Sequence, residues 1–317
     1  MKKKISSIVL LTLTLLSSCT KEFKDEIIPK NPKKVKLEIS IPQVTTKSGT
    51  ESSVESLQIY VFKKDGKLDA YAKFTDDSRT LSCTTGEKDI VAIVNAPDIS
   101  NVANKVALQN NLSALEDNTP TALVMYGEIN KNIRVDSNIE IPVTRLAARI
   151  SIKKITKNFT STYYQNKQMM VTNIFLVNAV GSVKYSGETD PTTWYNKGKY
   201  ISNPADDLLY ENINKVVSNG STLTQTYSFY TYPNPTTTET GENKFTRLAV
   251  EVTLDSKTYY YPITIEGIQS NHTYDITELI ITRLGSDSPD IPVSSTDATF
   301  NISVKEWIEG SSTTETI

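Results

Sequence analysis

Alternating apolar and polar residues near the start of the chain predict a strand with one buried face. Val35, Leu37, Ile39 and Ile41 share one side, and the residues between them are polar. A proline ends the strand, and residues 45–53 are small and polar, with no apolar anchor. Exposed segments of this composition are where proteases cut, so a processing loop is predicted to follow the first strand.

The same period of two recurs along the rest of the chain. Residues 57–61 and 68–72 flank an Asp-Gly turn and predict a hairpin. The run 89–96 is almost continuously apolar, which is typical of a strand buried on both faces. Residues 100–116 are the best candidate for a short helix. Further strands are predicted at residues 123–127, 139–143, 145–152, 171–177, 227–232, 245–254, 259–265, 274–281 and 300–304.

Many short strands separated by turn residues predict an all-β protein, with two antiparallel β-sandwich domains in tandem and short helices in the loops. A length of 317 residues also favours two domains over one. We place the N-terminal sandwich at residues 48–147 and the C-terminal sandwich at residues 148–307, followed by an extension at residues 308–317.

The first residues predict export. Three lysines precede a short apolar run, so residues 1–18 are interpreted as a secretory signal rather than a membrane span. The run ends in Leu16-Ser17-Ser18-Cys19, which resembles the bacterial lipobox and implies that Cys19 carries lipid. An ordinary signal peptide that happens to contain a cysteine is the alternative. Residues 19–47 then comprise a polar tether and the first strand.

Composition argues against most enzyme and nucleic-acid functions. The net charge is −2 and no basic block lies outside the leader, so nucleic acid is not an expected partner. His272, Cys19 and Cys83 are the sole histidine and cysteines, too few for a His/Cys metal site or nucleophile. Acidic pairs such as Asp76-Asp77 are expected to be solvated. We therefore predict no catalytic residue, no metal and no cofactor.

Three features allow either a structural or a functional interpretation. The side-chain oxygens at residues 285–290 could bind calcium. The same composition is also typical of an ordinary polar turn. His272 is expected to be a hydrogen-bonded turn residue rather than a base. The tyrosines at 227–232 and 259–261 could stack on sugar rings, or could close the edge of a sandwich core.

A set of motifs, taken in chain order, resembles the fimbrillin family of major fimbrial subunits, which form lipoprotein-derived type V pili. No single motif is specific, but the ordered set covers the chain from about residue 35 to its end. The motifs are Leu57-Gln58-Ile59-Tyr60-Val61-Phe62, Arg145-Leu146-Ala147-Ala148-Arg149, Phe229-Tyr230-Thr231-Tyr232-Pro233-Asn234, Tyr259-Tyr260-Tyr261-Pro262, Asn271-His272-Thr273-Tyr274-Asp275 and Val304-Lys305-Glu306-Trp307.

The resemblance implies two transthyretin-like sandwich domains in a subunit exported as an outer-membrane lipoprotein and matured at the surface by a trypsin-like protease. Cutting after the first strand would release that strand with the lipid. Another subunit would then insert its C-terminus into the groove that is left, a mode of β-strand addition. Expected partners are further copies of the chain, related tip and anchor subunits, the protease and the outer membrane. The mature form is expected in extracellular fimbriae, where it supports adhesion.

This sequence has both parts of that device. Val35, Leu37, Ile39 and Ile41 form the removable strand. The first arginine is Arg79, so an arginine-specific cut in the loop is impossible. The predicted cleavage lies between Lys47 and Ser48, with Lys33, Lys34 or Lys36 as the alternative positions. Removing residues 1–47 takes ten of 34 basic and four of 36 acidic residues, which leaves 24 against 32 and a net charge of −8.

The extension at residues 308–317 is the predicted donor strand. Thr313, Glu315 and Ile317 lie on one side of it, although the segment is less apolar than the strand it would replace. Two other functions remain open at this point. One is a monomeric surface lipoprotein that binds glycans, and the other is a tip or anchor subunit of the pilus.

Overall fold

The computed structural model describes residues 32–42, 51, 53–76, 79–189 and 191–307, and the backbone of residues 315–316. Residues 33–317 form one compact unit. The chain is nearly all β, as predicted. Within the part of the chain that the structure describes, no helix has the length and apolar character that a membrane crossing needs.

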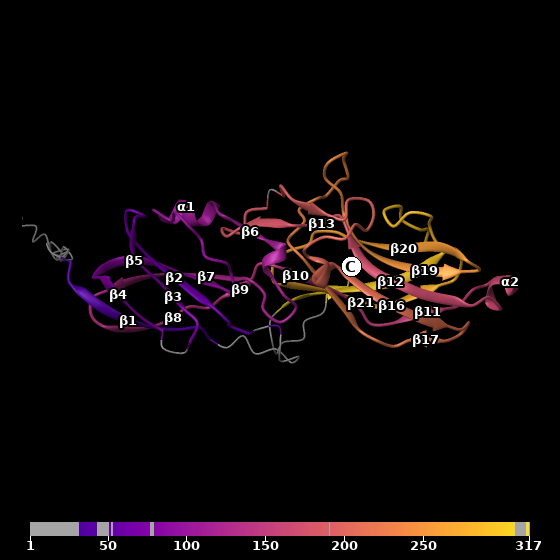
Figure 1. Cartoon of the computed structure of the whole chain (residues 1–317), viewed down its shortest axis with the longest axis horizontal. Helices are drawn as coiled ribbons and strands as arrows, with labels where there is room; N and C mark the ends of the chain where they lie inside the picture. Colours follow the sequence, from indigo (N-terminus) through magenta and orange to yellow (C-terminus); the bar gives the residue numbers. More distant parts are fainter. Residues whose placement is uncertain are drawn as a thin grey trace, which may run out of the picture. The chain divides into compact units, whose positions relative to one another are not determined.

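The N-terminal half contains a five-stranded antiparallel sheet, which faces a three-stranded sheet across a shared core (Figure 1). The order in the larger sheet is β3-β2-β5-β7-β9, formed by β2 (Leu57–Lys63), β3 (Leu68–Phe74), β5 (Gly86–Val94), β7 (Met125–Ile133) and β9 (Thr144–Arg145). The order in the smaller sheet is β4-β1-β8, formed by β1 (Lys34–Ser40), β4 (Thr80–Thr84) and β8 (Ser137–Glu140).

The C-terminal half is built in the same way from two larger sheets. One has the order β16-β12-β19-β20 and consists of β12 (Met169–Val177), β16 (Tyr210–Val217), β19 (Thr246–Leu254) and β20 (Lys257–Ile265). The other has the order β17-β11-β21-β10-β18, with β22 beside β21. Its strands are β10 (Ala148–Ile152), β11 (Ile155–Lys157), β17 (Thr222–Leu223), β18 (Tyr227–Thr231), β21 (His272–Ile281), β22 (Ala298–Glu306) and β23 (Glu315–Thr316).

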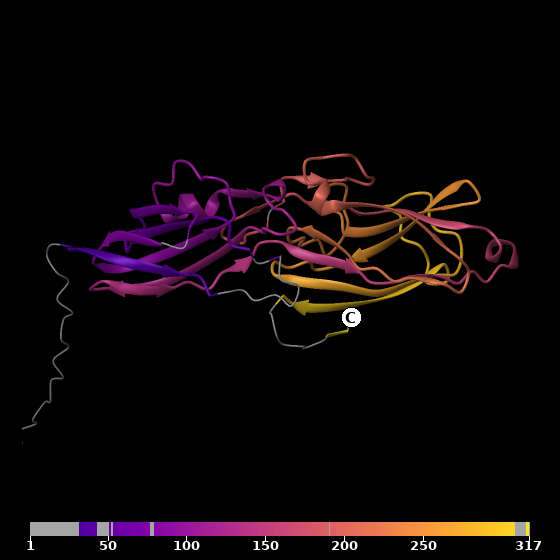
Figure 2. The same ribbon diagram turned by 60° about the horizontal axis from the view of Figure 1, so that its bottom comes forward.

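Figure 2 shows β21 and β22 side by side in orange and yellow. Pairing is mostly antiparallel, but β1–β8, β10–β21 and β11–β21 are parallel.

Short elements connect the sheets. Two small ladders join β13 (Ala179–Val180) to β15 (Trp194–Tyr195) and β14 (Ser182–Lys184) to β6 (Leu112–Ala114). The described residues include the helices α1 (Lys105–Asn110), α2 (Thr162–Gln165) and α3 (Asp206–Leu209), and the 3-10 turn η1 (Leu115–Asp117). The helix predicted within residues 100–116 is thus shorter than expected, because Leu112–Ala114 pairs with β14 as a strand.

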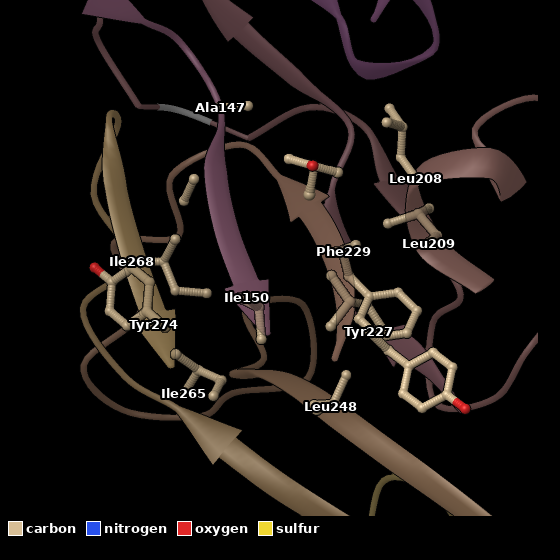
Figure 3. Close-up of a cluster of buried hydrophobic side chains, with 14 of the residues drawn as sticks. Ala147, Ile150, Leu208, Leu209, Tyr227, Phe229, Leu248, Ile265, Ile268 and Tyr274 are labelled. Carbon is tan, nitrogen blue, oxygen red and sulfur yellow. The ribbon is translucent and has the colours of Figure 1, made fainter. Parts of the chain in front are cut away.

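The larger hydrophobic core fills the C-terminal half and continues under the five-stranded sheet. Ile150, Phe229, Leu248 and Ile265 converge from four different strands in its centre (Figure 3). Tyr60, Phe62, Val91 and Ile93 belong to the same core. The five-stranded sheet is therefore covered on both faces, which explains why its central strands are almost continuously apolar.

The hairpin of β2 and β3 has the predicted Asp-Gly turn, with Gly66 at a φ of +79° that favours glycine. β9 pairs with the N-terminal sheet and β10 with the C-terminal one, so pairing changes sides between Arg145 and Ala148. The exact domain boundaries stay a prediction.

Candidate functional site

The first strand holds two other strands together. β1 pairs antiparallel with β4, with Val35 opposite Cys83 and Leu37 opposite Leu81. On its other edge β1 pairs parallel with β8, with Ile39 opposite Ile139. In the described part of the chain β4 and β8 form no ladder with each other. Without β1, both strands would lose their pairing partner.

The inward side of β1 is part of the N-terminal core. Val35, Leu37, Ile39 and Ile41 are all buried, and Leu37 has 0% exposure. Lys34, Lys36 and Glu38 lie on the exposed side. Each buried side chain contributes about 1.5–3 kcal/mol by leaving water, so the four together contribute roughly 6–12 kcal/mol. The predicted amphipathic strand, and the buried face assigned to it, are confirmed.

The surface beneath β1 is apolar and comes from both sheets. The residues that form this surface belong to the smaller hydrophobic cluster. The same cluster includes the four inward side chains of β1, which would be lost if β1 were removed. The five-stranded sheet and the strands beside β1 contribute Leu57, Ile59, Val61, Leu81, Ile90, Ala92, Val94, Met125 and Ile139. A groove lined in this way accepts an extended segment whose alternate side chains are apolar.

Cys83 lies in β4 against β1. It is 3% exposed and carries a free thiol. Burial raises the pKa of this thiol to about 11, with a smaller contribution from the charge of Asp69. Because the thiolate is the reactive form, Cys83 is protected both by its cover and by its pKa.

A buried ion pair lies close to Cys83. Lys88 is 2% exposed, and its Nζ is 2.8 Å from Asp69 Oδ2. Thr84 donates to the same carboxylate from its main-chain nitrogen, at 2.8 Å, and from its hydroxyl. Burial alone would raise the pKa of Asp69, but the hydrogen bonds from Lys88 and Thr84 outweigh it and lower this pKa. The pair fixes the end of β4 that lies against the start of β1.

Several predicted site residues lie outside the described residues. These are Cys19, Lys47, Ser48, Thr313 and Ile317. Glu315 is described only through its backbone, which belongs to β23 and pairs with Val304 of β22 in the same chain. Their predicted roles in lipidation, cleavage and strand donation stay predictions.

The remaining candidates have structural roles where the structure describes them. His272 is hydrogen-bonded as expected, with Nδ1 2.8 Å from the main-chain oxygen of Ser270, but it is the first residue of β21 rather than a turn residue. Asp290 of the possible calcium turn is engaged by Arg247 at 2.6 Å and Asn178 at 2.7 Å. Among the tyrosines considered for sugar binding, Tyr227, Tyr230, Tyr232 and Tyr261 are buried, and Tyr259 and Tyr260 are half-buried.

One part of the site was missed in the sequence. Thr80–Thr84 forms β4, the antiparallel partner of β1, but no strand was predicted there. The sequence does contain a strand signal here, because the apolar residues Leu81 and Cys83 alternate with polar ones, and both are buried in the structure. Leu81 and Cys83 are the only two apolar positions of β4, so the alternation is weak.

The fold is that of solved adhesion and fimbrial proteins. A protein of Bacteroides eggerthii assigned provisionally to cell adhesion has a TM-score of 0.66 at 16% identity, covering 88% of this chain and 97% of that one. The fimbrilin of Porphyromonas gingivalis W83 has a TM-score of 0.61 at 15% identity, over 88% and 98% of the two chains. The tip fimbrial protein Mfa3 of Porphyromonas gingivalis, truncated at its C-terminus, has a TM-score of 0.51 at 14% identity, over 85% and 99%.

These likenesses place the chain in a class of β-sandwich proteins that includes fimbrial subunits. The family model of the major fimbrial subunit protein (FimA) matches residues 37–190. Over that region the sequence is similar to this family, which confirms the resemblance predicted from the motifs. No curated protein matches the sequence. The family is one of structural subunits that assemble with other subunits into cell-surface fimbriae.

Proposed function

We propose that this chain is a structural subunit of the stalk of a cell-surface fimbria, with no catalytic centre, polymerised by donor-strand exchange. One observation carries the proposal: among the described strands, β1 lies between β4 and β8, which pair with β1 and not with each other. A strand in that position can leave and be replaced without refolding of the five-stranded sheet.

Removal of β1 would create two needs at once. The N–H and C=O groups of β4 and β8 that face β1 would lose their partners, and an apolar groove would meet water. Exposure of this groove to water costs free energy in addition to the roughly 6–12 kcal/mol that the four side chains of β1 contribute by their own burial. An extended segment from another copy would satisfy both needs, which gives assembly its driving force.

The C-terminal residues 308–317 are the proposed donor, with Thr313, Glu315 and Ile317 on one side. In the single chain, Glu315 and Thr316 pair with β22 of the same molecule. That ladder is two residues long, so little pairing must break before the segment can be offered to a neighbour.

Maturation would precede exchange. Cys19 would carry the lipid of an outer-membrane precursor, and a trypsin-like protease would cut between Lys47 and Ser48. The lipid and β1 would leave together, and the remaining subunit would join extracellular fimbriae with other copies and with tip and anchor subunits. Adhesion would be a property of the assembled fibre.

Cys83 provides a direct test, because β1 covers it. A Cys19→Ser precursor contains Cys83 as its sole thiol. We expect a maleimide to label this thiol slowly in the intact precursor and quickly after trypsin has cut at Lys47 and the fragment has been removed. Labelling should fall again when the cut protein polymerises.

Lys47→Gln is the matched control, since it should leave the thiol protected and the chain monomeric under the same treatment. A thiol that stays unreactive after the cut, or polymer formed by uncut Lys47→Gln protein, would overturn the proposal. The N-terminal sequence of protein sheared from cells gives an independent check. A start near Ser48 is expected, whereas acylated Cys19 would indicate an anchor subunit or a glycan-binding lipoprotein.

A further inference from the structure

Both arginines of the Arg145-Leu146-Ala147-Ala148-Arg149 motif make cation–π contacts with one aromatic ring. The guanidinium of Arg145 lies 4.4 Å from the centre of the Trp307 ring, and that of Arg149 lies 4.7 Å from it. Tyr230 of β18 stacks on the same ring, with centroids 6.1 Å apart and planes at 21°. The main-chain nitrogen of Trp307 donates to the oxygen of Asn271 at 2.6 Å. Trp307 is thereby fixed in both ring and backbone.

Glu51 completes this cluster from a distant part of the sequence. Its Oε2 is 2.6 Å from Arg149 Nη1, and its Oε1 accepts a hydrogen bond of 2.5 Å from the Tyr230 hydroxyl. Arg145 Nε lies 3.5 Å from the main-chain oxygen of Glu51. Glu51 is 7% exposed, although it belongs to the polar stretch between β1 and β2. We call these five residues, Glu51, Arg145, Arg149, Tyr230 and Trp307, the arginine clasp.

The two ends of the clasp coincide with the two segments that polymerisation would change. Glu51 lies four positions after Lys47, on the side of the cut that remains in the mature chain. Trp307 immediately precedes the proposed donor at residues 308–317. Glu51 and Arg145 are buried and Arg149 is half-buried. Burial makes the contacts selective, because a buried carboxylate or guanidinium group is stable only when it meets an opposite charge or an aromatic face.

We propose that the arginine clasp keeps the new N-terminal segment of the matured subunit docked on the C-terminal half and holds the root of the donor tail in place. It thereby sets the limit of processing at Glu51. This inference rests on the proposed function, since it assumes a cut before Glu51. In this proposal the Arg145–Arg149 motif positions two segments, the new N-terminal segment and the root of the donor tail. A cluster that only stabilised the fold would not do this.

The test is native digestion of the Cys19→Ser precursor with proteinase K, followed by N-terminal sequencing and intact mass. For the wild type we expect the final N-terminus to lie no later than Glu51. Glu51→Gln has nearly the same shape but lacks the charge that holds Arg149. We expect this variant to be trimmed beyond position 51 at least tenfold faster than the wild type.

Two further variants test whether the effect is specific to the arginine clasp. Glu55→Gln removes an exposed carboxylate of the same segment and should be trimmed like the wild type. Tyr230→Phe removes only the hydroxyl that donates to Glu51 and keeps the ring on Trp307, so it should increase trimming by a smaller factor. It also provides an answer if Glu51→Gln does not fold.

Trp307 offers a second readout. The chain has two tryptophans, so Trp194→Phe leaves Trp307 as the sole tryptophan, whose emission can be excited selectively over that of the tyrosines. In that background we expect Glu51→Gln, but not Glu55→Gln, to shift the emission, because the guanidinium groups over the ring lose their carboxylate.

Equal trimming of the wild type, Glu51→Gln and Tyr230→Phe would overturn the clasp while leaving strand exchange intact. A Cys83 thiol that never reacts, together with faster trimming of Glu51→Gln, would instead refute strand exchange and retain the clasp.

Discussion

Replacing Leu37 by alanine should weaken the precursor and leave the fibre unchanged. Leu37 is fully buried at the centre of β1, packed in the smaller hydrophobic cluster. Loss of a leucine from such a site costs about 2–5 kcal/mol, from lost transfer energy and the cavity that remains. In the uncut chain this appears as a lower free energy of unfolding. After the cut it appears as faster release of the fragment, by about 30-fold to several thousandfold if the whole effect falls on dissociation.

The assay compares three variants in two forms of the protein. Guanidinium unfolding of the Cys19→Ser precursor gives the stability of the uncut chain, and thermal dissociation of sheared fibres gives that of the polymer. Leu57→Ala is the matched control, because Leu57 is a buried leucine of the same cluster that stays in the mature subunit. It should weaken both forms. Glu38→Ala changes the exposed side of β1 and should change the precursor by less than about 0.5 kcal/mol.

The result distinguishes loss of β1 with the cleaved fragment from retention of β1 in the fibre. If position 37 leaves with the fragment, fibres grown from Leu37→Ala are chemically identical to wild-type fibres and dissociate at the same temperature. Fibres of Leu37→Ala that are weakened as much as those of Leu57→Ala would show that β1 is retained, and the reasoning from its position between β4 and β8 would fail.

Three other changes test the surrounding structure. Asp69→Asn leaves Lys88 buried without its carboxylate and should cost about 3–5 kcal/mol in guanidinium unfolding near pH 7. Folding lowers the pKa of Asp69, so its contribution is present above the unfolded value of about 3.9 and disappears as the pH falls through the folded value; the difference between variant and wild type must shrink there. Gly127→Ala puts a Cβ against the main-chain oxygen of Pro142 and should destabilise the monomer by about 1–3 kcal/mol in thermal melts. Deleting residues 311–317 should give stable monomers that do not polymerise, and normal polymer would exclude the C-terminal donor.

Local pattern in the sequence was enough to find most strands. The alternation of Val35, Leu37, Ile39 and Ile41 identified β1 and its buried face, because a strand places successive side chains on opposite sides. The Asp-Gly turn identified the hairpin of β2 and β3 for a similar reason. The ordered motifs also indicated the fimbrillin family, which the match over residues 37–190 bears out. All of these signals come from residues close together in the chain.

Only the tertiary structure decided which distant segments meet. Nothing local to β1 specifies that its neighbours are β4 and β8, or that it runs parallel to the latter, because ladder partners depend on how the whole sheet closes. The same holds for Glu51, a single acid in a polar stretch whose burial depends on Arg149 and Tyr230 from the other half of the chain. The sequence therefore determined the strand β1 and its buried face, while the fold determined which strands β1 holds together. Periodicity records how each segment is buried, and pairing depends on contacts between segments that no short window contains.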